Sequence, residues 1–204
     1  VEVSGELKDM LEEASLVDRS PVIPQEHLDK ACESLLRVPT HDRRHEHWGW
    51  KQPNSHILLP QLDRCFPEMK YVYVVRNGLD MAFSSNQNQL KYFWGDLMLD
   101  GDTEPTPANA LRYWVASHKR MQGFRKRMGH RLHFLSFDKL CTDPEGELEA
   151  LREFAAIQIS KKELVDLAQT VSQPSTSGRF RQQDLSQFDP ADIEFVRQMG
   201  FEVE

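Results

Sequence analysis

The fold is decided by the stretch YVYVVRNGLDMAFS, residues 71–84. Its first five residues form an unbroken β-branched and aromatic run, which is typical of a strand buried on both faces of a parallel sheet. Asn77-Gly78 predicts a turn, and Asp80 is a candidate N-cap for the helix that follows. We therefore expect a strand, a tight turn and a helix, with Arg76 at the carboxyl end of the strand.

Strand and helix patterns alternate along the rest of the chain. Residues 132–137 form a second apolar run of strand length, and the spacing from Ala108 onward predicts a long helix before it. Asp143-Pro144 and Asp189-Pro190 each place an N-cap before a first-turn proline, which predicts two more helix starts. This alternation indicates an α/β fold in one domain, residues 1–204. Because parallel sheets normally have more strands, we expect that others are short or that one on the N-terminal side is absent.

The first third of the chain has the spacing of amphipathic helices. Two apolar stripes recur at helical intervals: Leu7, Met10, Leu11 and Ala14, and then Leu28, Ala31, Cys32, Leu35 and Leu36. We expect both stripes to face the hydrophobic core.

Composition narrows the classes of function. Of the 204 residues, 39% are hydrophobic and 28% are charged, which excludes collagen-like and disordered chains. The net charge of −7 argues against nucleic acid or a membrane surface as a partner, because both are polyanions. No run approaches the roughly 20 apolar residues that span a bilayer.

The three cysteines, Cys32, Cys65 and Cys141, are an odd number and lie far apart. We interpret them as reduced thiols, which predicts a cytoplasmic location. A Golgi lumen stays open as the location if an anchor segment precedes Val1.

An arginine and a serine flank the predicted turn. Ligands of open α/β sheets bind at the carboxyl ends of strands, where Arg76 is expected. Its planar guanidinium matches phosphate oxygens, and Ser84 adds a hydroxyl near a helix N-terminus. The residues therefore predict an anion held between Arg76 and Ser84. In the alternative interpretation, Arg76 pairs with a surface acid and Ser84 packs as a small helix residue.

Four segments, in the same order, resemble the sulfotransferases that use 3′-phosphoadenosine-5′-phosphosulfate (PAPS). The Arg-Asn pair, with Asp80 four residues and Ser84 eight residues after the arginine, resembles their 3′-phosphate-binding motif. The other segments are WGWKQP (48–53) with LLP (58–60), LSFDKL (135–140) with Asp143-Pro144, and SGRFR (177–181). The LSFDKL segment is similar to that of the bacterial and tyrosylprotein-type branches of the family.

This resemblance implies a helix-rich, three-layer α/β fold of the P-loop nucleoside-kinase type, with a central parallel sheet. It also implies transfer of a sulfuryl group from PAPS to a hydroxyl or amine of a small-molecule, peptide or carbohydrate acceptor. The implied nucleotide-binding residues are Arg76, Ser84, Ser177, Gly178 and Arg179. Lys51 matches the family lysine that contacts the transferred group; the alternative is a solvated lysine in a loop.

Two parts of the family pattern are missing. The glycine-containing loop that cradles the 5′-phosphosulfate is not found, so we expect a domain that is N-terminally incomplete and lacks its first strand. In one branch the general base is a histidine two residues after the lysine, but here that position is Pro53. The remaining candidates for the base are His47 and His56, whose ordinary pKa suits proton transfer. The alternative is a partly exposed loop residue, which is the commoner role of such histidines.

No metal is expected. His41 and His45 have the i, i+4 spacing of helical metal ligands, but no matching cysteine or histidine cluster follows them. Sulfuryl transfer from PAPS needs no metal.

Two other functions stay open. A nucleotide kinase-like phosphotransferase would need a GxxxxGK[ST] loop and carboxylates for Mg²⁺, neither of which is visible. A catalytically inactive nucleotide-binding module would keep the phosphate site without turnover.

Overall fold

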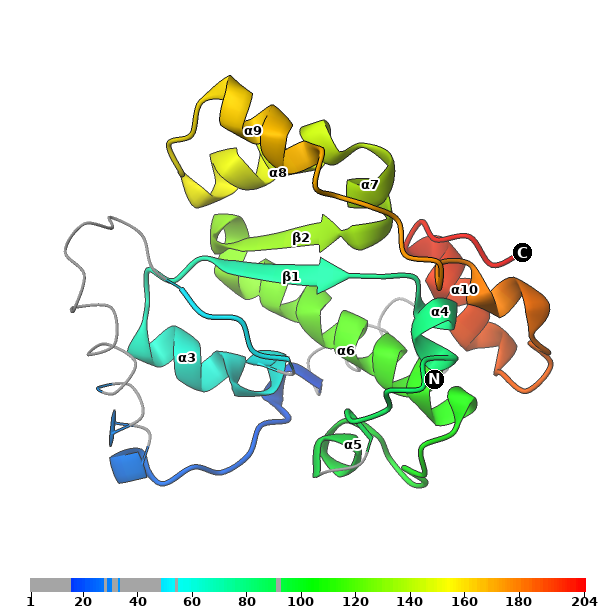
Figure 1. Cartoon of the computed structure of the whole chain (residues 1–204). Coiled ribbons are helices and arrows are strands. Elements are labelled where there is room, and N and C mark those ends of the chain that lie inside the picture. The colour runs from blue at the N-terminus through cyan, green and yellow to red at the C-terminus, as the bar shows by residue number, and fades with distance from the viewer. Residues whose placement is uncertain (1–15, 28, 31–32, 34–48, 54, 91–92) are drawn as a thin grey trace, which may run out of the picture.

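The computed structural model describes residues 16–27, 29–30, 33, 49–53, 55–90 and 93–204 (Figure 1). Both helical stripes expected in the first third of the chain lie outside these residues, as do His41, His45 and His47.

Helices make up most of the described elements. The strands are β1 (Tyr71–Val75) and β2 (Leu132–Ser136). The helices are α3 (Leu59–Cys65), α4 (Gly78–Ala82), α5 (Phe93–Met98), α6 (Pro107–Met128), α7 (Phe137–Thr142), α8 (Pro144–Ala155), α9 (Lys161–Ala168) and α10 (Pro190–Gln198), with 3-10 turns η2 (Ser55–Leu58), η3 (Gly129–Arg131) and η4 (Arg179–Gln182).

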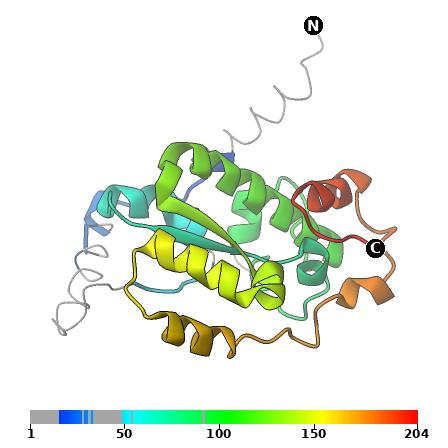
Figure 2. The same cartoon turned by 90° about the horizontal axis from the view of Figure 1, so that it is seen from above.

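The sheet of the described chain consists of β1 and β2 in parallel. Its register runs from Tyr71 opposite Leu132 to Val75 opposite Ser136. Helix α6 lies along one face of the sheet, and α8 and α9 lie on the other (Figures 1 and 2). Both strands point toward α4, α7 and α10, so their carboxyl ends meet at one edge (Figure 1). The predicted α/β class with a parallel sheet is confirmed, and layering of the nucleoside-kinase type stays a prediction.

The predicted burial of β1 on both faces is wrong. Val75 is 5% exposed and packs in the core, whereas Val74, on the opposite face, is 57% exposed. The difference arises because α8 packs on β2. A β-branched run therefore specified the strand correctly, but not how much of it is covered.

Two of the predicted helix starts are confirmed. The Asp143 carboxylate accepts the N–H of Gly146 at 3.1 Å, and the Asp189 carboxylate accepts that of Ala191 at 2.8 Å. In both helices a proline follows the cap, where no intrahelical N–H is needed. Helix α6 begins in the same way, with Thr106 as its N-cap.

The helix after the turn differs from the prediction. Its N-cap is Asn77, so Asp80 lies inside α4 rather than before it. The helix ends at Ala82, where the side chain of Gln87 donates to the carbonyls of Ala82 at 2.9 Å and Ser84 at 2.8 Å. Ser84 consequently lies beyond a five-residue helix and not within its first turns.

Helix α6 organises the core with one buried charge. Arg120 is 0% exposed and donates to the carbonyls of Leu16, Val17 (3.1 Å), His56 (3.2 Å) and Ile57 (3.3 Å). Burial lowers its pKa to about 10. These bonds tie the segment before β1 to α6, because a buried guanidinium must satisfy all its donors.

One cysteine contradicts the sequence interpretation. Cys65 is disulfide-bonded, whereas Cys141 is free; Cys32 lies outside the described residues. The interpretation of all three as reduced thiols is therefore wrong. The prediction of a cytoplasmic location rested on that interpretation and loses its support.

None of the helices in the described residues combines the length and the apolar character that crossing a bilayer requires.

Candidate functional site

The turn after β1 is fixed from both sides of one peptide group. The indole N–H of Trp114 donates to the carbonyl of Arg76 at 3.0 Å, and the N–H of Asn77 donates to the Asp138 carboxylate at 3.0 Å. The side-chain amide of Asn77 also donates to the carbonyl of Glu202 at 2.8 Å. The peptide group between Arg76 and Asn77 is therefore held in one orientation.

Glycine is required at the next position. A Cβ on Gly78 would lie 2.7 Å from the Trp114 ring, closer than real Cβ contacts. The glycine thus lets α4 approach α6 closely enough for the Trp114 indole to reach the turn.

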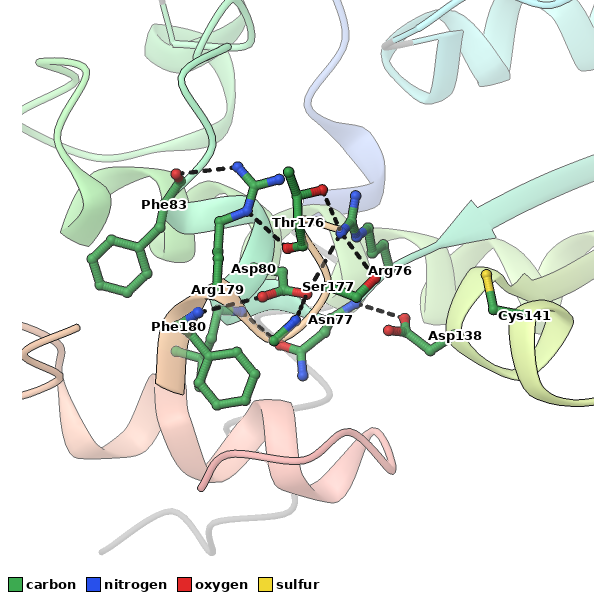
Figure 3. Close-up of polar contacts among 12 residues, drawn as sticks. Arg76, Asn77, Asp80, Phe83, Asp138, Cys141, Thr176, Ser177, Arg179 and Phe180 are labelled. Atoms are coloured by element: carbon green, nitrogen blue, oxygen red, sulfur yellow. Dashed lines mark hydrogen bonds and ion pairs between the residues drawn. The ribbon is translucent and has the colours of Figure 1, made fainter. Parts of the chain in front are cut away.

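The Arg76 guanidinium lies among hydroxyls and one carboxylate (Figure 3). Its Nη2 is 3.4 Å from both Thr176 Oγ1 and Ser177 Oγ, and 3.6 Å from Asp80 Oδ2. The guanidinium carbon lies 5.3 Å from the centre of the Phe137 ring. Its Nε is buried and has no partner among the described residues. Arg76 thus combines a held position with an unused donor.

The carboxylate that reaches Arg76 also holds a distant loop. Asp80 is 2% exposed, and its Oδ2 accepts the N–H of Gly178 at 2.8 Å, while Oδ1 is 3.5 Å from the N–H of Phe180. Gly178 has φ 75°, a left-handed conformation that favours glycine. Phe180 is 1% exposed and anchors the loop in the core.

A second guanidinium lies on the other side of the loop. Arg179 donates from Nε to the carbonyl of Thr176 at 3.1 Å and from Nη1 to the carbonyl of Phe83 at 3.3 Å. Thr176 lies between the Arg179 and Arg76 guanidinium groups (Figure 3). Both hydrogen bonds of Arg179 are to neutral carbonyls, so neither of them offsets its positive charge.

The structure brings together four of the five residues that the resemblance assigned to the nucleotide: Arg76, Ser177, Gly178 and Arg179. The fifth, Ser84, follows Phe83 and is partly buried, and its hydroxyl accepts the N–H of Asn86 at 3.2 Å. Within the described chain it makes no hydrogen bond to Arg76. Sequence reasoning gave Asp80 a capping role and a place in the family motif, but no role in binding, and it did not single out Thr176.

The structure describes two of the three residues assigned to catalysis. Lys51 is exposed in the segment before η2, and His47 lies outside the described residues. His56 is 5% exposed, with its Nε2 3.4 Å from the Tyr113 hydroxyl. Burial and the charge on Arg120 lower the pKa of His56 to about 3. This histidine is therefore neutral and shielded from solvent.

A cavity of about 550 Å³ opens at the carboxyl ends of both strands. Its lining includes Asn77, Asp138 and Lys139, beside the turn, and neither Arg76 nor Ser84. Burial raises the pKa of Asp138, against the opposing effects of the Asn77 N–H and the Arg76 charge. Arg76, Thr176, Ser177 and Arg179 form what we call the Arg76 cluster. Ligands of α/β folds bind at the carboxyl ends of strands, so this cluster lies next to a cavity in the usual position of a ligand site.

A comparison with known protein families identifies the family of this chain. The model of the sulfotransferase family matches residues 4–161, and the chain therefore belongs to that family. The match includes Lys51 and Arg76 and ends before the loop that carries Ser177 and Arg179. No curated protein and no solved structure matched the chain.

Proposed function

We propose that this protein transfers a sulfuryl group from PAPS to a hydroxyl or amine acceptor. The observation that supports the proposal most strongly is the Arg76 cluster. A permanently charged guanidinium lies at the carboxyl end of a parallel strand, with the hydroxyls of Thr176 and Ser177 at 3.4 Å and the charge of Arg179 beyond them.

The cluster has the chemistry of a phosphate site. Arginine offers a planar fork of donors to phosphate oxygens, and hydroxyls supply further donors. The guanidinium of Arg76, whose side chain is 20% exposed, and the two hydroxyls are groups that a 3′-phosphate would contact. Arg179 would add a second positive charge, and Ser84, next to Phe83, would complete the site from the side of α4.

Bound PAPS supplies an activated sulfuryl group on a phosphate leaving group. Negative charge develops on the sulfonyl oxygens and on that phosphate during transfer, and a fixed cation stabilises it. We assign this role to Lys51, following the family pattern. We assign no step to His56, because its neutral ring is buried, and His47 remains the histidine candidate for the general base.

The test is calorimetric binding of adenosine 3′,5′-bisphosphate to the wild type and to Arg76→Ala. Hydrogen bonds to charged groups contribute about 1.5–3 kcal/mol, so we expect the substitution to weaken binding roughly 10- to 100-fold. The control is Arg152→Ala, which removes an arginine paired with Glu149 on α8 and should leave binding unchanged.

Two results would overturn the proposal. One is a wild-type protein that does not bind the bisphosphate. The other is a protein that prefers ATP with Mg²⁺ over the bisphosphate, which would favour a phosphotransferase.

A further inference from the structure

We infer that Asp80 is a positioning residue of the proposed phosphate site, whose carboxylate joins Arg76 to the loop 176–180 before any nucleotide binds. The inference rests on the proposed function, because it concerns the binding of the same nucleotide. It assigns to an acidic side chain a favourable role in binding an anion.

The geometry makes Asp80 the shared partner of two chain segments. Its Oδ2 receives the N–H of Gly178 at 2.8 Å and lies 3.6 Å from Arg76 Nη2, and its Oδ1 lies 3.5 Å from the N–H of Phe180. The contact joins residues 98 positions apart in the sequence. At 2% exposure the carboxylate has little water, so these partners must compensate its charge.

This arrangement sets the position of the loop hydroxyls. Thr176 and Ser177 precede Gly178 directly, and both hydroxyls lie 3.4 Å from Arg76 Nη2. Because Phe180 is buried on the other side of Gly178, the loop would remain attached without Asp80 but would lose its fixed distance from Arg76. A preorganised site binds more tightly because less freedom is lost on binding.

Simple electrostatics predicts the opposite sign. A negative charge 3.6 Å from Arg76 weakens the attraction of the site for a phosphate, so its removal should strengthen binding. Positioning predicts that removal weakens binding. The sign of the change therefore separates the two roles.

The experiment measures calorimetric binding of adenosine 3′,5′-bisphosphate to the wild type, Asp80→Asn and Asp80→Glu. We expect at least about fivefold weaker binding for both variants, because Asn removes the charge and Glu displaces it. The matched control is Asp143→Asn, which makes the same charge change at the α8 N-cap and should bind like the wild type.

A double-mutant cycle adds a readout that a purely structural role would not move. If Asp80 acts through the loop, Ser177→Ala should cost much less affinity in the Asp80→Asn background than in the wild type. Additive effects of the two substitutions would overturn the inference.

The outcomes separate the two proposals. A wild type that fails to bind the bisphosphate overturns the proposed function. A wild type that binds, together with an Asp80→Asn variant that binds equally or more tightly, overturns only the positioning role. If Asp80→Asn fails to fold, Asp80→Glu decides, and wild-type affinity in that variant contradicts the inference.

Discussion

Acidification from pH 7.5 to pH 5 should destabilise the protein through two buried histidines. His118 is 1% exposed, its Nδ1 lies 3.0 Å from the carbonyl of Trp114, and its ring stacks on Trp114 at a centroid distance of 3.8 Å. Burial lowers its pKa to about 4, and burial with the Arg120 charge lowers that of His56 to about 3. Both rings therefore stay neutral in the folded protein at pH 5.

The sign and the size follow from linkage. Unfolded histidine takes up a proton below a pKa of about 6.5, so the unfolded state binds more protons than the folded state and stability falls as the pH falls. At pH 5, about 1.5 units below that value, each histidine costs about 2 kcal/mol, or roughly 4 kcal/mol for the pair. The loss begins near pH 6.5 and continues down to the lowered pKa values of the folded state.

The assay is urea unfolding at pH 7.5 and pH 5, for the wild type and for a His56→Gln/His118→Gln variant. The double variant should lose roughly 4 kcal/mol less than the wild type between the two pH values, whatever its stability at pH 7.5. His27→Gln, at an exposed histidine, is the control and should not change the pH dependence. Equal losses of stability in wild type and double variant would refute the reasoning.

Three further substitutions or treatments test the fold. Reduction, or Cys65→Ser, should lower stability by about 2–4 kcal/mol in chemical unfolding, because the disulfide constrains the unfolded chain; unchanged unfolding under reductant would contradict this. Arg120→Met should lower the free energy of unfolding by about 3 kcal/mol or more, because it leaves the buried carbonyls of residues 16–17 and 56–57 without their donor; a change within about 0.5 kcal/mol would contradict the role given to Arg120. Gly78→Ala should lower the melting temperature through a clash with Trp114, whereas Gly49→Ala, with open space around it, should not.

The parts of the fold that sequence predicted are those encoded locally. The unbroken apolar run defined β1, the Asp-Pro pairs defined the starts of α8 and α10, and the position of Arg76 followed from the end of the strand. Each of these features depends on residues that are close together in the sequence, within a single turn or a single strand. The length of α4 was not predicted, because the carbonyl of Ala82 at its end is satisfied by the side chain of Gln87, which lies outside the helix.

The parts of the site that were missed depend on long-range contacts. Aspartate is a common helix cap, so the sequence around Asp80 predicted that role. Only the folded chain brings the N–H of Gly178, 98 residues later in the sequence, to its carboxylate. The sequence around His56 resembles a loop, but the folded chain buries this histidine in contact with Arg120 on α6. The resemblance to a family assigned Ser177 and Arg179 to the nucleotide, which no local pattern would have done, and this assignment stays a prediction.

The central claim is that Arg76 binds the ribose phosphate of a nucleotide. A crystal structure of the protein soaked with adenosine 3′,5′-bisphosphate tests it most directly. The account predicts electron density for the 3′-phosphate within hydrogen-bonding distance of the Arg76 guanidinium and the Ser177 hydroxyl. Density for the bisphosphate elsewhere, with Arg76 still in contact only with the protein, would contradict it.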